Sequence, residues 1–570
     1  METGFWNSKR APGVPDNINP DEYGSILEVF EASVKKYADN PVVTGIGHTL
    51  TFRELDQYST RLAAWLQAYT DLKPGDRIAI QMPNLLQYPV AVYAAVKAGL
   101  VIVNTNPLYT AREMKHQFND SGAKALICMD VFGHMVEEIL KETPIKHLLI
   151  TSLADMLPTP KRILINVAAK HIKKMVKPYR LPQATAFRKA LNKGRSLNYK
   201  RPPSPKSHDV AILQYTGGTT GVAKGAMLTN RNMVSNMLQA QAMLKQRDPD
   251  GNPLYQPGQE TIVAPLPLYH IYSFTVHLMA MVEMGNHSIL IANPRDTAMF
   301  IKMIKPWKFS AFIGLNTLFT SLMNHPEFKS CDFSNLKVTL SGGTALQSEV
   351  AKRWKDITHC GISEAYGLTE CSPAVCMNPF GELTQQGTVG LPMPNTELKT
   401  IDAEGNETPI GERGELCIRG PQVMKGYWNQ KQATDDILSS DGWLRTGDVA
   451  IIKEDGFISI VDRLKDMVLV SGFNVYPNEI EDVVAKHNDV EHCAVIGVPD
   501  KKTGEAVKLF VVRKNSNLNR EELIGHCRKH LTGYKVPKQI EFRDELPMTP
   551  VGKILRKDLR AQELKRLEAA

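Results

Sequence analysis

The sequence predicts an α/β protein with mainly parallel sheets, followed by a small α+β module. The first observation is an alternation of apolar, strand-like runs with helical patterns between about residues 76 and 343. The second is a change after Gly381 to short strands separated by glycine-rich turns, and the third is a compact segment beyond Asp462. Strands that alternate with helices are typical of parallel sheets covered by helices.

Seven apolar runs in the first region are predicted strands: 77–82, 100–104, 124–129, 146–152, 211–217, 310–316 and 337–343. The most apolar stretch, 85–103, is interrupted by Pro89 and Lys97 and divided by Gly99. We therefore predict a buried helix that runs into a buried strand, and no membrane span. After Gly381, the runs 414–421 and 455–463 indicate an antiparallel or barrel-like part.

The C-terminal segment contains predicted helices at 479–487 and 520–531 and predicted strands at 492–500 and 507–514. A segment of this length is sufficient for a separate small domain. We therefore expect a first domain over residues 1–462 and a second over residues 463–570.

Composition places the chain among ordinary globular proteins, with 570 residues, 43% hydrophobic and 22% charged. The first 25 residues lack the apolar core of a signal peptide. None of the eight cysteines forms a CxxC pair, and no His/Cys cluster has zinc spacing. Scattered reduced thiols in a cytoplasmic protein are the expected interpretation.

One segment, 161–201, supplies the basic character of a chain whose net charge is +8. It contains thirteen Lys and Arg and no acidic residue. Five apolar residues recur in it at helical spacing: Ile165, Ala168, Ala169, Ile172 and Val176. Two interpretations stay open: a basic amphipathic helix on an anionic membrane surface, or a solvated helix that covers the protein's own core. No nucleic-acid binding is expected, because no aromatic-interleaved module accompanies the charge.

The stretch 214–230, "QYTGGTTGVAKGAMLTN", is a candidate phosphate loop. A strand that enters a turn rich in glycine and threonine presents several backbone N–H groups and hydroxyls to an anion, and Lys224 adds a mobile charge. The loop is not a Walker A motif, because Gly225 stands where that motif needs serine or threonine. An ordinary flexible turn is the alternative.

Six further motifs follow this loop: "PLPLYHIYSF" (265–274), "SGGTAL" (341–346), "YGLTE" (366–370), "WLRTGD" (443–448), "VDRLKDMVLVSGFNVYPNEIE" (461–481) and "PVGKILR" (550–556). Together they resemble the motifs of adenylate-forming enzymes, and most closely those of bacterial long-chain fatty-acid–CoA ligases. The resemblance spans nearly the whole chain. It implies a large N-terminal adenylate-forming domain of parallel α/β subdomains with a small β-barrel-like part, and a small mobile C-terminal domain.

The resemblance implies a two-step reaction. A fatty-acid carboxylate displaces pyrophosphate from ATP to give acyl-AMP, and CoA then takes the acyl group and releases AMP. The implied ATP-binding residues are Thr216, Gly217, Gly218, Thr219, Thr220, Gly221, Lys224, Tyr366, Gly367, Thr369, Asp448 and Arg463. Glu370 is the implied Mg²⁺ ligand. Lys224, Thr369 and Glu370 join Lys553 as the implied catalytic residues.

Lys553 resembles the lysine that bridges the carboxylate and the α-phosphate during adenylation. In this family the small domain rotates between the two steps, so Lys465 matches the hinge and Gly472 the channel for CoA. The implied acyl-binding residues are His270, Phe274, Asn316 and Gly343. A packed histidine without a chemical role is the alternative for His270.

The expected partners are a long-chain fatty acid, ATP and CoA, with peripheral association at the anionic cytoplasmic face of the inner membrane. The resemblance also allows a homodimer. Three rival functions stay open: a ligase for aryl acids or an acyl-AMP ligase that serves a carrier protein, a P-loop kinase or ATPase, and an inactive membrane-bound fatty-acid-binding protein. The reaction products would distinguish the second of these functions from adenylation, because a kinase or ATPase yields ADP.

Overall fold

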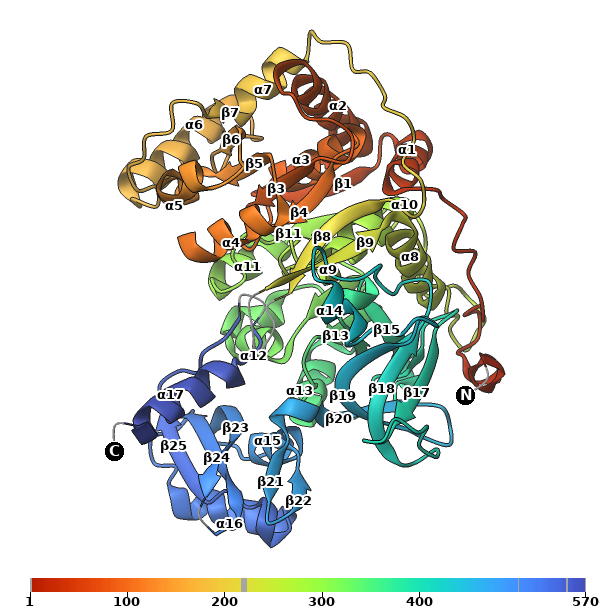
Figure 1. Ribbon diagram of the computed structural model, residues 1–570, viewed down its shortest axis with the longest axis vertical. Helices are drawn as coiled ribbons and strands as arrows, with labels where there is room; N and C mark the ends of the chain where they lie inside the picture. Colours follow the sequence, from red (N-terminus) through yellow and green to blue (C-terminus); the bar gives the residue numbers. More distant parts are fainter. Residues whose placement is uncertain (1–2, 217–222, 501, 550–551, 569–570) are drawn as a thin grey trace.

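The computed structural model describes residues 3–216, 223–500, 502–549 and 552–568. It confirms the predicted α/β architecture, with two large, mainly parallel sheets followed by a smaller antiparallel sheet and a C-terminal α+β module. Helices α6 (Thr159–Val167) and α7 (Phe187–Gly194) lie towards one end of the molecule's longest axis and the C-terminal module towards the other (Figure 1). Within the described ranges, no helix is long and apolar enough to cross a bilayer.

The first sheet consists of β3 (Arg77–Gln81), β4 (Val101–Asn104), β5 (Ala125–Met129), β6 (His147–Thr151), β7 (Thr185–Ala186), β8 (Val210–Thr216) and β9 (Lys224–Thr229). The order across the sheet is β7-β6-β5-β3-β4-β8-β9. All neighbours are parallel except β8 and β9, which form an antiparallel hairpin. Five of the predicted strands are thereby confirmed.

The second sheet consists of β1 (Pro41–Gly45), β2 (His48–Thr51), β10 (Thr261–Ala264), β11 (His287–Leu290), β12 (Ala311–Gly314), β13 (Val338–Gly342), β14 (Ile362–Gly367), β15 (Ala374–Met377) and β16 (Leu391–Pro392). Its order is β16-β15-β14-β13-β12-β10-β11-β1-β2. The strands from β14 to β1 in this order are parallel, and β2, β15 and β16 pair antiparallel at the edges.

Helices of the first 360 residues connect these strands. They are α1 (Ile26–Tyr37), α2 (Phe52–Tyr69), α3 (Gln87–Lys97), α4 (Ala111–Ser121), α5 (Gly133–Ile139), α8 (Asn230–Leu244), α9 (Ile271–Ser273), α10 (Met281–Glu283), α11 (Thr297–Ile304), α12 (Asn316–Asn324) and α13 (Ser348–Thr358). Three of them begin at a capping box formed by Thr51, Thr110 or Thr229. The largest hydrophobic core joins α1, α2, α3 and α8 to strands of both sheets.

The apolar stretch 85–103 folds as predicted. Every residue of α3 is buried, and the chain turns at Gly99, whose φ of +73° favours glycine, before it enters β4. All eight cysteines are buried and none is in a disulfide. The prediction of a buried helix followed by a buried strand is confirmed.

The third sheet has the order β17-β18-β19-β20 and is wholly antiparallel. Its strands are β17 (Glu397–Ile401), β18 (Arg413–Arg419), β19 (Leu444–Ile452) and β20 (Ile458–Arg463), and α14 (Lys431–Asp435) lies between β18 and β19 in the sequence. The sequence predicted an antiparallel or barrel-like part here, and the structure shows an antiparallel sheet with β17 and β20 at its edges.

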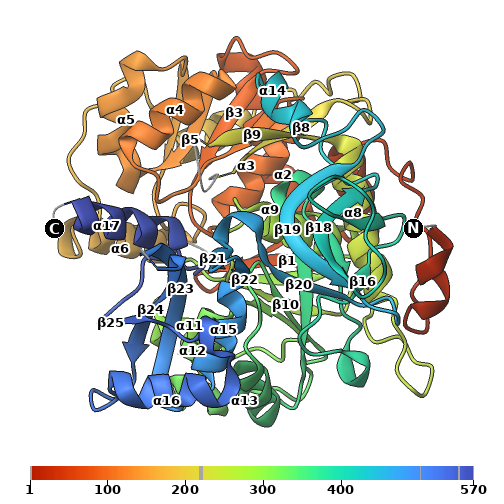
Figure 2. The same cartoon turned by 60° about the horizontal axis from the view of Figure 1, so that its bottom comes forward.

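The C-terminal module has its own hydrophobic core and its own sheet, in the order β22-β21-β24-β23, with β25 beside β24. Its elements are β21 (Val468–Val470), β22 (Phe473–Val475), α15 (Pro477–Ala485), β23 (Val490–Asp500), β24 (Gly504–Arg513), α16 (Arg520–His530), β25 (Gln539–Arg543) and α17 (Arg556–Glu568). All four elements predicted there from the sequence are confirmed. Figure 2 shows α17 alongside β23 in a view turned from Figure 1, and the two elements are in contact.

Candidate active site

The hairpin β8–β9 holds the two ends of the predicted phosphate loop. Thr216 and Lys224 are directly opposite each other in the last described pair. Gly225 packs against Tyr215, since a Cβ at this glycine would lie 3.0 Å from the tyrosine ring. The loop residues expected between the two ends lie outside the described part of the chain: Gly217, Gly218, Thr219, Thr220 and Gly221.

Lys224 and Glu370 are linked through one tyrosine. Nζ of Lys224 lies 5.1 Å from the centroid of the Tyr427 ring. The hydroxyl of Tyr427 donates a 2.6 Å hydrogen bond to Oε1 of Glu370, which lies in the short helix η7 (Thr369–Cys371). Burial and the charge of Glu370 raise the pKa of Tyr427, so the hydroxyl stays a donor. Lys224 of the loop and Glu370, the predicted Mg²⁺ ligand, therefore both lie next to Tyr427.

Tyr366, Asp448 and Arg463 form a connected cluster. The hydroxyl of Tyr366, on β14, donates a 2.6 Å hydrogen bond to Oδ2 of Asp448 on β19. Oδ1 of Asp448 lies 3.1 Å from Nε of Arg463, its neighbour across β19 and β20. Next to Tyr366, a Cβ at Gly367 would lie 2.2 Å from the carbonyl oxygen of Pro373, so this position requires glycine.

Lys553 is positioned by a tight turn that docks on α12. Its backbone N–H donates a 3.0 Å hydrogen bond to Oγ1 of Thr549. The carbonyl of Gly552 accepts a 3.3 Å hydrogen bond from Oγ1 of Thr317, a residue 235 positions earlier. Gly552 has φ of +80°, and a Cβ there would lie 2.5 Å from the same hydroxyl oxygen. Only glycine allows this approach between the C-terminal module and the second sheet's helix.

The ammonium group of Lys553 interacts electrostatically with residues from three other motifs. Burial lowers the pKa of Lys553 to about 8, with a further decrease from Arg463, while Asp448 acts in the opposite direction. Burial, followed by the charge of Lys553, lowers the pKa of His270 to about 4. At pH 7, Lys553 is therefore charged and His270 is neutral.

Two of the predicted acyl-pocket residues lie in the segment after β10. His270 precedes α9 and accepts, at Nδ1, a 3.3 Å hydrogen bond from the backbone N–H of Tyr272. Phe274 is fully buried at the start of the π-helix η5 (Phe274–Ala280). Both side chains are thus fixed by packing and capping, while their contact with an acyl chain stays a prediction.

Of the other two residues of that set, Gly343 lies in the loop after β13 and Asn316 is the first residue of α12. Gly343 has φ of +92°, which favours glycine. The side-chain amide of Asn316 donates to the carbonyl of Ala345 at 2.5 Å and accepts from the backbone N–H of Gln347 at 3.1 Å. Asn316 therefore holds the loop that contains Gly343, and this is the role that the contacts support.

The predicted hinge and CoA-channel residues lie in the C-terminal part of the chain. Lys465 is in the short helix η9 (Leu464–Asp466), directly after β20, and burial together with the charge of Arg463 lowers its pKa. Gly472 lies in the exposed turn between β21 and β22, with φ of +85°. The structure does not bring Gly472 into the cluster around Asp448.

Comparison with known proteins establishes the family. The model of the "AMP-binding enzyme" family matches residues 30–428, and that of the "AMP-binding enzyme C-terminal domain" matches residues 479–553. The chain belongs to the AMP-binding enzyme family. Lys224, Glu370 and Lys553 lie within the two matched regions.

Relatives within this family resemble the chain over nearly its whole length. It is 50% identical over 555 residues to the long-chain-fatty-acid–CoA ligase of Salmonella typhimurium strain LT2, and the aligned region covers 97% of each protein. It is 50% identical over 560 residues to the long-chain-fatty-acid–CoA ligase of Yersinia pestis, and the aligned region covers 98% of each protein. Among solved structures, the anthranilate CoA ligase AuaEII with anthranoyl-AMP has a TM-score of 0.82 at 22% identity, over 96% of this chain and 99% of that one.

Three contacts in this AMP-binding enzyme were not predicted from the sequence. They are the link from Tyr427 to Glu370, the docking of Gly552 on Thr317, and an ionic cluster around Arg556. Arg556 lies three residues after Lys553, at the start of α17, and binds carboxylates from both sides of the predicted hinge. Its partners are Asp462 at 3.4 Å, Asp466 at 3.3 Å and Glu481 at 2.7 Å. The only sequence signal for it was the arginine within the "PVGKILR" motif.

Glu370 has the chemistry expected of a Mg²⁺ ligand. Its Oε1 accepts the hydrogen bond of Tyr427, and Oε2 has no hydrogen-bond partner among the described residues. One carboxylate oxygen that is not already paired suits a hard cation that keeps most of its water and phosphate ligands. The residues present therefore fit Mg²⁺ bound together with a nucleotide.

Proposed function

We propose that the chain is an AMP-forming long-chain fatty-acid–CoA ligase. The observation that carries the proposal is the docking of the Lys553 turn on α12, which brings one ammonium group to the Asp448–Arg463 pair. Relatives that are 50% identical over nearly the full length bear this name, which supports the fatty-acid substrate. Adenylation requires a carboxylate and a triphosphate to meet, so a positive group between the two anions is a chemical necessity.

In the first step, a fatty-acid carboxylate oxygen attacks the α-phosphorus of ATP, and pyrophosphate leaves. Thr216, Lys224 and the loop between them would hold the β- and γ-phosphates. Asp448 would accept hydrogen bonds from the ribose hydroxyls, and Tyr366 would stack on adenine. Lys553 would neutralise charge on the carboxylate and on the α-phosphate as they approach each other. Bound Mg²⁺, held by Glu370, would neutralise further phosphate charge.

In the second step, the thiol of CoA attacks the acyl carbonyl carbon, and AMP leaves. We propose that residues 463–570 rotate about Lys465 between the steps, which withdraws Lys553 and brings Gly472 to the CoA channel. A hinge needs only a few residues that absorb large changes in φ and ψ. Arg556 would resist this rotation, since it joins Asp462, before the hinge, to Asp466 and Glu481, after it.

Acid-dependent exchange of pyrophosphate into ATP tests the substrate class. We expect palmitate and oleate to support exchange and aryl acids such as coumarate or anthranilate to support far less. Each buried methylene contributes about 0.8 kcal/mol, so the rate constant kcat/KM should rise several-fold for each added CH₂ until the pocket is filled. Exchange with aryl acids alone would instead show that the chain is an aryl-acid ligase.

We also propose that the segment 161–201 binds an anionic membrane surface. Ile165 and Ala169 face the protein's own core, as in one of the two sequence interpretations. Ile172, however, was predicted on the same face and is 76% exposed, and Leu164 is 71% exposed. The helix α6 and the π-helix η4 (Ala168–Ile172) therefore have a second, outward apolar set: Ile163, Leu164, Val167, Ile172 and, just beyond, Met175.

Exposed basic residues are interspersed with this outward set in the sequence, which suits an anionic bilayer as its partner. Lys170, Lys173, Lys174 and Lys177 are all exposed, and the segment contains no acidic residue. Each lysine near an anionic membrane surface contributes about 1 kcal/mol, and apolar side chains at the interface add to it. The proposed location is the cytoplasmic face of the inner membrane.

Co-sedimentation with anionic vesicles tests this proposal. The protein should bind at low salt and be released as salt rises, because the electrostatic part is screened. Leu164→Gln combined with Ile172→Gln should weaken binding by about tenfold or more, since each loses the burial of a large apolar side chain. Leu383→Gln, at an exposed leucine elsewhere, is the matched control. Absence of binding at low salt would refute the membrane proposal.

A further inference from the structure

A pocket of about 340 Å³ lies between α2, α6 and α7, apart from the residues assigned to catalysis. These helices lie at the end of the molecule away from the C-terminal module (Figure 1). The pocket is lined by His48, Glu54, Tyr58, Arg61, Asp155, Met156, Leu157, Pro158, Thr159, Arg162, Arg188, Leu191 and Asn192. None of them belongs to the motifs of the proposed ligase site, so the pocket has no role in the chemistry described above.

Three arginines from three different helices meet in this pocket: Arg61 from α2, Arg162 from α6 and Arg188 from α7. Across the described chain, none of the three forms an ion pair with a carboxylate. Arg188 donates one hydrogen bond of 2.8 Å to the backbone carbonyl of Asp155, and Arg61 lies over the Tyr58 ring at 5.2 Å. Most of their N–H donors therefore have no partner among the residues that the structure describes.

Two of these positive charges, Arg162 and Arg188, repel each other. Burial and then the charge of Arg162 lower the pKa of Arg188, while Asp155 acts in the opposite direction. A bound anion would relieve this repulsion, because like charges in a partly buried site raise the free energy of the folded protein.

The two carboxylates of the pocket offset only part of the charge of the three arginines, since Asp155 raises the pKa of Arg188, and their side-chain hydrogen bonds go to other groups. Oε2 of Glu54 accepts the backbone N–H of Thr51 at 2.9 Å in the capping box of α2. Asp155 accepts the backbone N–H of Ser152 at 2.9 Å and the amide of Asn166 at 3.1 Å. Both carboxylates thus serve the local backbone and a neighbouring amide, and the guanidinium groups stay available.

We propose that this pocket is a second anion site that binds a phosphate ester. Guanidinium groups form paired, charge-assisted hydrogen bonds with phosphate oxygens, and three of them around one cavity match a phosphate with several free oxygens. A volume of about 340 Å³ is in the range of sites for small ligands and leaves room for the group esterified to the phosphate.

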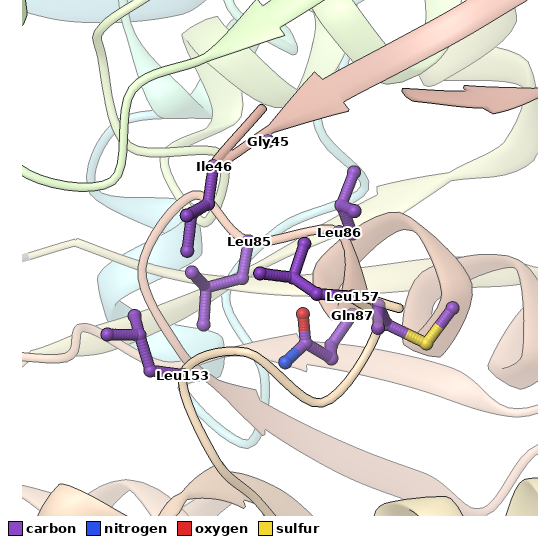
Figure 3. Close-up of a pocket in the computed structure, with 8 residues that line it drawn as sticks. Gly45, Ile46, Leu85, Leu86, Gln87, Leu153 and Leu157 are labelled. Carbon is purple, nitrogen blue, oxygen red and sulfur yellow. The ribbon is translucent and has the colours of Figure 1, made fainter. Parts of the chain in front are cut away.

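The ligand could be a membrane lipid headgroup or a soluble phosphate ester, and both share this chemistry. The surroundings suit a lipid: Arg162 is on the same helix as the exposed Leu164. Met156 and Leu157 line both this pocket and a small apolar pocket beside it. Figure 3 shows the small pocket, with Leu157 among its labelled residues. That second pocket is lined by Gly45, Ile46, Leu85, Leu86, Gln87, Leu153, Met156 and Leu157.

Binding measurements on the full chain test the site, with an acyl sulfamoyl adenosine, an analogue of acyl-AMP that contains no phosphate, at saturation so that the proposed nucleotide site is occupied. The soluble arm titrates inorganic phosphate and glycerol 3-phosphate by calorimetry at constant ionic strength. The membrane arm compares vesicles that contain phosphatidate, a monoester, with vesicles that contain phosphatidylglycerol, a diester, at matched surface charge. Arg162→Gln is the first variant, because its side chain makes no hydrogen bond in the described protein; the second replaces all three arginines with glutamine.

We expect Arg162→Gln to weaken phosphate binding by about tenfold or more and the triple variant to abolish it, since hydrogen bonds between charged groups are lost. Lys170→Gln with Lys173→Gln and Lys174→Gln is the matched control, which removes three charges outside the pocket. This control should lose vesicle binding in general but keep phosphate binding. Failure of the membrane proposal is thereby distinguished from failure of the pocket.

Phosphate binding together with a preference for phosphatidate that the triple variant loses would identify a lipid site. Phosphate binding without that preference would identify a soluble phosphate ester as the ligand. The proposal is overturned if wild-type protein binds no phosphate under these conditions, or if the triple variant binds it as tightly as the wild type while unfolding at a similar temperature.

Discussion

Lys553→Ala should abolish formation of acyl-AMP and leave the transfer of a supplied acyl-AMP to CoA largely intact. With its turn docked on Thr317, Lys553 is close enough to Asp448 and Arg463 for both charges to affect its pKa. Removing a preorganised positive group from a site where two anions meet costs about 100-fold to 1,000-fold in rate. The second step requires no charge at this position, because acyl-AMP is already formed.

Single-turnover measurements of each step separate these effects. Lys557→Ala is the matched control, since this lysine is exposed on α17 only four residues further on. It should leave both steps near the wild-type rate. Equal loss of both steps in Lys553→Ala would show that the lysine supports the fold or the binding of substrate in general.

Asp448→Asn should shift the pH dependence of adenylation. In the wild type, kcat/KM for adenylation should fall as the pH rises through about 8, because the active form of Lys553 is protonated and its pKa in the free enzyme is lowered to about 8. Arg463 lowers this pKa and Asp448 raises it, and Arg556 and Asp466 act in the same two directions with smaller effects. Without the carboxylate, the charge of Arg463 is no longer balanced, so the fall should occur at lower pH.

The same variant should raise KM for ATP by about tenfold to 100-fold, since ribose hydroxyls lose a charged hydrogen-bond acceptor. Asparagine still accepts the hydrogen bond of Tyr366, so the fold of the cluster is kept. Asp441→Asn, at an exposed turn before β19, is the control and should change neither quantity. An unchanged pH profile in Asp448→Asn would contradict the coupling between Asp448 and Lys553.

The buried strands and α3 could be predicted because their patterns are local. β-Branched runs bounded by turn residues are typical of buried strands, and the division of the stretch 85–103 at Gly99 separated a helix from β4. The site residues that belong to short motifs, such as Gly367 and Lys553, were instead implied by the resemblance of those motifs to adenylate-forming enzymes. The structure adds the partners that position them, and their roles stay predictions.

Contacts between distant segments could not be predicted in this way. Tyr427 and Glu370 are 57 residues apart, and Thr317 and Gly552 are 235 apart, so no periodicity joins them. The outward apolar set of α6 was missed for a different reason. Its pattern has apolar residues on more than one side, and only packing decides that Ile165 faces the core while Ile172 faces solvent.

The most direct test follows the oxygen atoms of the fatty acid. Palmitate labelled with ¹⁸O in its carboxylate is turned over with ATP and CoA, and the nucleotide product is analysed by mass spectrometry. Attack by the carboxylate on the α-phosphorus predicts AMP that carries one labelled oxygen, together with unlabelled pyrophosphate. ADP as the product, or AMP without the label, would contradict the proposed reaction.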